Sequence, residues 1–175
     1  MGLAAAVVLL AAAAQAAFPV FGPNDVKTVF FISKSDDRNR VDYLMRLDAT
    51  CSAPDDEAIV PYWREFEPPP PVRTKELSML AKMGYGVASQ KTVKKGPNGG
   101  DYFMRLKQVG RPIGIATRRG SDGHCMTTAR MTIAGGTAEL LSIFVKLGGP
   151  LSVDYIDIKG RDLSTGKPVF ERLKR

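Results

Sequence analysis

Short apolar stretches bounded by turn-forming residues recur along most of this chain. Residues 40–48 show the pattern most clearly, because every second position is apolar: Val41, Tyr43, Met45 and Leu47. A two-residue period is typical of a half-buried β-strand. Similar stretches follow with turn signals about every 8–12 residues, without the strand–helix alternation of a parallel sheet. The pattern therefore predicts a mostly β fold, an antiparallel β-sandwich or barrel.

We expect about nine or ten strands. The first two, at residues 26–34 and 40–48, flank the loop SDDRN and should form an antiparallel hairpin. The third, at residues 59–67, contains Pro61, which cannot donate to a ladder, so this strand should lie at an edge or start late. The later strands are expected at residues 85–94, 101–109, 111–118, 125–134, 137–147, 151–162 and 166–173, with a tight hairpin turn at Gly135-Gly136.

One segment, residues 74–83, has the features of a short α-helix. Thr74 is an acceptable N-cap residue, Leu77 and Leu80 share one face, and Gly84 follows as a stop signal. A helix of this length is not stable alone in water. We therefore expect it to pack on the sheet, where it could plug one open end.

The chain begins with an uncharged run rich in Ala, Val and Leu that ends in Ala14-Gln15-Ala16. The run is shorter than the roughly 20 apolar residues of a membrane-spanning helix, and small residues at its end are typical of a signal-peptidase site. We predict a signal peptide at residues 1–16, a single β-rich domain at residues 17–175, and a periplasmic or extracellular location. No later segment reaches spanning length, so no transmembrane segment is expected in the mature chain.

The two cysteines, Cys51 and Cys125, gain significance from this compartment. In an oxidising environment they can form a disulfide, which the chain-entropy model values at roughly 4–5 kcal/mol for so long a loop. Sequence does not show whether their Cα atoms lie close enough. Two separate buried thiols therefore remain the alternative.

The net charge of +7 restricts the possible partners. No basic stripe interleaved with aromatic residues is present, so nucleic acid is not a predicted partner. Outside the cytoplasm the anionic partners would be lipid headgroups, lipopolysaccharide phosphates or acidic glycans. A solvated basic surface that aids solubility is the simpler interpretation.

Catalytic and metal-binding patterns are weak. His124, the single histidine, precedes Cys125, but neighbouring side chains on a strand point to opposite faces, which argues against a thiol–imidazole pair. No spacing of metal ligands and no cofactor-binding motif is found, so we predict neither a metal nor a cofactor.

Aromatic residues gather in the first three expected strands. They could simply form the core, but Tyr and Trp are also common in ligand sites because each joins an apolar body to a polar tip. Tyr43, Tyr62 and Trp63 are therefore the predicted ligand-binding residues.

The segments "FFISKSDDRNRVDYLMRLD", "CSAPDDEAIVPYWREFE" and "YGV" resemble a family of secreted bacterial domains of unknown function, number four-eight-three-three. The matching positions are Phe30, Ile32, Ser35, Asn39, Val41, Tyr43, Tyr62, Trp63, Tyr85 and Gly86. The resemblance covers about residues 26–173. It implies a secreted single domain and brings no known activity, cofactor or catalytic residue.

Together these features predict an exported, non-catalytic binding or interaction module. Its partner would be a small apolar molecule, a lipid or an envelope protein that contributes a strand. One alternative is a hydrolase that uses His124 with Cys125 or a serine nucleophile. Another is a structural envelope protein that pairs through an edge strand such as residues 59–67.

Overall fold

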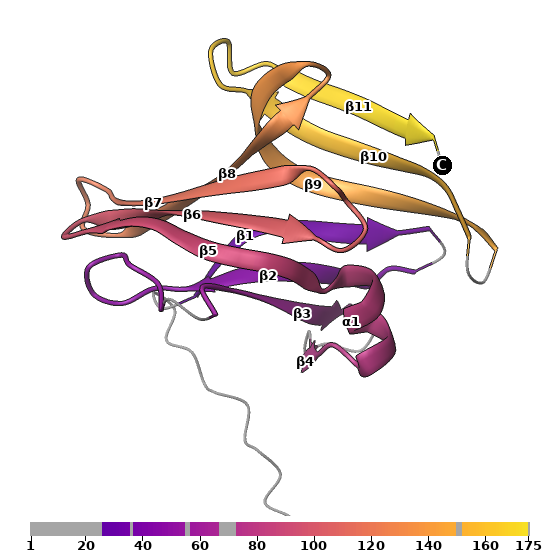
Figure 1. Ribbon diagram of the computed structural model, residues 1–175, viewed down its shortest axis with the longest axis horizontal. Helices are drawn as coiled ribbons and strands as arrows, with labels where there is room; N and C mark the ends of the chain where they lie inside the picture. The colour runs from indigo at the N-terminus through magenta and orange to yellow at the C-terminus, as the bar shows by residue number, and fades with distance from the viewer. Residues whose placement is uncertain (1–25, 36, 55–56, 67–72, 150–151, 175) are drawn as a thin grey trace, which may run out of the picture.

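The computed structural model describes residues 26–35, 37–54, 57–66, 73–149 and 152–174; the predicted signal peptide lies outside them. These residues form one strongly curled sheet and one short helix (Figure 1), which confirms the mostly β prediction. The elements are β1 (Val26–Lys34), β2 (Arg40–Arg46), β3 (Ile59–Glu65), β4 (Arg73–Glu76), α1 (Met79–Tyr85), β5 (Val87–Gly96), β6 (Gly99–Leu106), β7 (Pro112–Arg119), β8 (Cys125–Ile133), β9 (Gly136–Gly149), β10 (Ser152–Asp162) and β11 (Pro168–Lys174). The described part of the chain contains no helix that is long and apolar enough to cross a membrane.

The sheet order is β4-β3-β2-β1-β9-β8-β7-β6-β5, and β10 and β11 continue from the other edge of β9. Strand β9 has 14 residues, so β8 and β1 pair with successive parts of one edge while β10 runs along the opposite edge. The first two strands form the predicted antiparallel hairpin. The β1–β9 pair is parallel, whereas the other described pairs are antiparallel. The result is a mixed, half-barrel sheet.

A side chain bridges the two ends of the curl. Gln90 on β5 accepts a hydrogen bond from the Ile59 amide at 2.9 Å and donates one to the Ile59 carbonyl at 3.3 Å. The Gln90 carboxamide thereby makes the two hydrogen bonds that the backbone of a neighbouring strand would make with Ile59. Pro61 lies two residues further along β3, so its nitrogen faces away from β2, as the Ile59 amide does. The N–H that proline lacks would therefore not have bonded to β2. Strand β4 covers β3 from Tyr62 to Glu65, so the predicted edge is occupied by β4 and Gln90.

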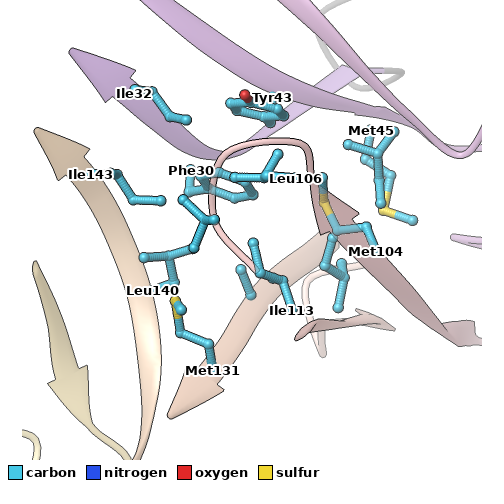
Figure 2. Packing of buried hydrophobic residues seen from close by; sticks show 14 of the residues in the cluster. Phe30, Ile32, Tyr43, Met45, Met104, Leu106, Ile113, Met131, Leu140 and Ile143 are labelled. Carbon is cyan, nitrogen blue, oxygen red and sulfur yellow. The ribbon is translucent and has the colours of Figure 1, made fainter. Parts of the chain in front are cut away.

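The core fills the inside of the curl. The Phe30 and Tyr43 rings stack at 4.4 Å between centroids, with 12° between their planes. Side chains from β6 to β9 meet them from the facing wall (Figure 2), among them Met104, Ile113 and Leu140. Both walls thus contribute to a single hydrophobic cluster.

Cys51 and Cys125 are joined by a disulfide, with their Cα atoms 5.3 Å apart. The bond connects the loop after β2 to the start of β8. The Thr117 hydroxyl donates to the Cys51 carbonyl at 2.6 Å, and the Tyr102 hydroxyl accepts from the Ala53 amide at 2.6 Å. The loop is therefore held on β6 and β7 by hydrogen bonds as well as by the sulfur bridge.

The helix differs from its predicted boundaries of 74–83. It begins at Met79, capped by the Ser78 hydroxyl, which accepts from the Ala81 amide at 3.2 Å. Residues 74–76 instead belong to β4, because the free edge of β3 offers them a backbone ladder. The helix starts five residues later than predicted, and this changes the face that it presents: Leu77 is buried before the helix, whereas Leu80 is exposed.

The turn between β8 and β9, in contrast, begins earlier than predicted. Ala134 and Gly135 occupy it with φ of 51° and 85°, and Gly136 is already paired with Ile133. Positive φ at both central residues matches the right-handed twist of a two-residue hairpin.

Candidate functional site

A cavity of about 900 Å³ lies at the end of the half-barrel where α1 packs. Its walls come from α1, the ends of β1, β3, β9 and β10, and the connection between β6 and β7. Most of the lining side chains are apolar, including Ile32, Trp63, Met83, Val109, Leu147 and Val153. The site is a hydrophobic pocket with a helix as part of its wall.

Strand register explains why Trp63 faces this cavity. Ile32 is opposite Val41, and Val41 is opposite Trp63, so all three side chains lie on the inner face of the sheet. On β9 the register against β10 shifts between Leu140 and Ser142. This bulge moves the inward direction from Leu140 to the odd-numbered positions that follow, and so brings Val145 and Leu147 to the cavity.

A few polar side chains lie at the rim of the cavity. Lys34 follows Ile32 on the inner face of β1, and its Nζ lies 3.2 Å from Asp37 Oδ2. The same Nζ lies 5.5 Å from the centre of the Trp63 ring, within cation–π range. Tyr85 contacts Trp63 with ring centroids 6.3 Å apart. Burial raises the pKa of Tyr85, so its hydroxyl remains neutral at physiological pH.

The C-terminal end of α1 is anchored to the core. The Tyr43 hydroxyl donates to the Tyr85 carbonyl at 2.6 Å, and burial raises the pKa of Tyr43 well above its ordinary value. Gly86 closes the helix by donating to the Lys82 carbonyl at 3.0 Å. A Cβ at Gly86 would collide with that carbonyl oxygen, so glycine is required at this close approach.

The structure separates the three predicted ligand-binding residues. Trp63 lines the cavity. Tyr43 is fully buried, at 0% exposure, and does not line the cavity. Its hydroxyl bonds to the carbonyl of Tyr85, which does. Tyr62 is 4% exposed on the opposite face of β3, where its hydroxyl accepts from Arg46 at 3.3 Å. A ligand-binding role for Trp63 remains a prediction with a suitable location.

The predicted thiol nucleophile is not available. The Cys125 sulfur is bonded to Cys51, so it has no thiolate to offer. His124 is exposed in the β7–β8 turn, where its backbone amide donates to Asp122 at 3.0 Å. Within the described residues its imidazole makes no hydrogen bond. The hydrolase alternative therefore loses its cysteine, and its histidine lacks an orienting partner in that part of the chain.

Sequence reasoning missed most of the cavity wall. The predicted helix at residues 74–83 contains Leu80 and Met83 but starts too early to show which face they occupy, and Leu147 and Val153 lie on strands far from Trp63 in sequence. The available signal in the sequence was the high share of apolar residues between Met79 and Tyr85.

The fold and the cavity define a class of protein: a disulfide-linked, curled β-sheet with an apolar pocket beneath one short helix. The chain belongs to the family described as Domain of unknown function (DUF4833), whose model matches residues 30–172. No curated protein and no solved structure matches it. Of the positions that carried the family resemblance, Ile32, Trp63 and Tyr85 line the cavity, and Tyr43 and Gly86 hold α1 beside it.

Proposed function

We propose that this protein is an exported, non-catalytic binding module that holds a small apolar or amphiphilic molecule in the cavity beside α1. The observation that carries the proposal is the cavity itself. Its volume of about 900 Å³ lies within the usual range of small-molecule sites, which are mostly apolar with a few polar groups at defined positions.

The chemistry of the rim supports binding rather than catalysis. Lys34 is engaged with Asp37 and the Trp63 ring, an arrangement suited to orienting a polar or anionic end of a ligand. Cys125 is held in the disulfide. An acyl chain or a comparable apolar group would fit among Val145, Leu147 and Val153.

Export is part of the proposal. The disulfide is of the kind that persists in oxidising compartments, and the apolar run ending at Ala16 is the predicted signal peptide. Expression with export, followed by mass measurement of the recovered protein, should give a chain that begins at residue 17. Recovery of the uncleaved chain in the cytoplasm would contradict this part of the proposal.

Trp63, the single tryptophan, provides a direct probe of the cavity. We expect dodecanoate, added below its micelle concentration, to change Trp63 emission saturably with one site per chain. The titration should be made both with the full chain and with a chain that begins at residue 17. A change that grows linearly without saturation would contradict a defined site.

A cavity-filling variant tests the location. Val153→Phe places a larger side chain in the pocket and should weaken dodecanoate binding by about tenfold or more, equivalent to about 1.4 kcal/mol. The matched control is Val93→Phe, because Val93 is exposed on β5 and does not line the cavity. Equal affinities of the two variants would place the ligand elsewhere.

A further inference from the structure

Helix α1 carries a cluster of large apolar side chains that face solvent. Met79 is 84% exposed, Leu80 75% and Met83 62%, and no residue of the helix is buried. Positions three or four apart lie on one face of a helix, so Met79, Leu80 and Met83 form a single patch. Isolated exposed apolar residues are common, whereas a contiguous patch marks an interaction surface.

Exposed lysines surround this patch. Lys82 lies within α1, Lys75 is on the adjoining β4, and the Lys107 amide donates to Gly86 at the end of the helix. Lys75 pairs with Glu65, but Lys82 and Lys107 form no ion pair among the described residues. Glu65 and Glu76 are acidic side chains beside the three lysines, so the described surroundings of the patch are net positive by one charge, and the whole chain carries +7.

Leu80 and Met83 also line the cavity, so the exposed patch is continuous with the apolar pocket. Helix α1 lies at one end of the molecule, beside the short strand β4 (Figure 1). We propose that α1 docks on an anionic lipid surface. Its apolar side chains enter the boundary between headgroups and acyl chains, and Lys82 and Lys107 contact the headgroups. Amphipathic helices at membrane surfaces bind through this combination of apolar insertion and lysine–headgroup attraction.

Co-sedimentation with vesicles of phosphatidylglycerol and of phosphatidylcholine tests the docking surface. The protein should bind the anionic vesicles, and the double variant Leu80→Ser/Met83→Ser should bind them about tenfold more weakly or worse. The matched control is Val93→Ser/Met126→Ser, which removes two exposed apolar side chains from β5 and β8 and should leave binding unchanged. Circular dichroism of each variant establishes that the fold is intact.

Charge provides a second readout. Lys82→Glu should weaken binding to anionic vesicles by roughly fivefold or more, and added salt should weaken binding of the unmodified protein. Equal binding to neutral and anionic vesicles would overturn the proposal. So would a dimer in solution that dissociates in Leu80→Ser/Met83→Ser, because the patch would then be the interface with a second copy.

The apolar N-terminal run requires its own control. Each comparison should be made in the full chain and in the chain that begins at residue 17. Loss of all vesicle binding when residues 1–16 are removed would assign the binding to that run and overturn the proposal. Dodecanoate binding followed by Trp63 emission needs no vesicle, so failure of docking and failure of the cavity can be distinguished.

Discussion

At the scale of single residues, Tyr43 connects the core to the candidate site. Its ring stacks on Phe30 while its hydroxyl satisfies the Tyr85 carbonyl at the end of α1. Tyr43→Phe keeps the ring and leaves that carbonyl without its donor. We expect a loss of about 1–3 kcal/mol in the free energy of unfolding, measured by urea denaturation.

The control for this variant is Tyr155→Phe. Tyr155 packs against Phe144 and Arg172 through its ring, and its hydroxyl makes no hydrogen bond among the described residues. Its removal should change stability little. A Tyr43→Phe protein as stable as this control would show that the hydroxyl contributes nothing to anchoring α1.

At the scale of secondary-structure elements, Gln90 joins β5 to β3 where no backbone ladder exists. Gln90→Glu keeps the acceptor for the Ile59 amide but places a carboxylate beside the Ile59 carbonyl in place of a donor. We expect a loss of about 1–2 kcal/mol in unfolding free energy at neutral pH. Hydrogen exchange at Ile59 should accelerate more than exchange in β7. Unchanged protection at Ile59 would contradict the bridge.

A second connection between elements links β11 to the start of β7. Arg111 donates to both oxygens of Glu171, at 2.6 and 2.7 Å, and Glu171 also accepts from the Ala134 amide. The Arg111 guanidinium lowers the pKa of Glu171 from 4.5 to about 2. A carboxyl with a lowered folded-state pKa adds stability above its ordinary pKa and loses this contribution as pH falls toward the folded-state value.

Glu171→Gln should therefore be less stable than the unmodified protein at pH 7, by about 1 kcal/mol. The difference should persist down to about pH 4.5 and shrink as pH approaches about 2. Thermal unfolding at several pH values measures it. A constant difference across this range would show that ionisation of Glu171 is not the cause. Arg111→Gln/Glu171→Gln isolates the pairwise contribution.

At the scale of the whole molecule, the disulfide joins positions 74 residues apart and fastens the β2–β3 loop to β8. Replacing both cysteines by serine should cost about 4–5 kcal/mol in the chain-entropy model, which is a large part of a typical domain's stability. Chemical denaturation of the oxidised and reduced protein measures this difference. A non-reducing mass that shows two free thiols would contradict the bond itself.

The sequence alone determined the strand-rich class and most strand positions. Alternation at Val41, Tyr43 and Met45 reports burial on one face, and this signal is local. The start of β1 at Val26 and its hairpin with β2 followed from the same signal and a short loop. The predicted helix begins too early because Thr74 is an acceptable cap, whereas residues 74–76 pair with β3 and Ser78 caps the helix instead.

The candidate site depended on tertiary structure. The residue type of Trp63 predicts a ligand-binding role, but only the register of β1, β2 and β3 shows that Trp63 faces inward while Tyr62 faces outward. The parallel β1–β9 pair brings together positions more than a hundred residues apart, and no local pattern encodes such a contact. Sequence determines which segments become strands because burial period is local, whereas the cavity arises where distant strands meet, and packing of the whole chain decides that.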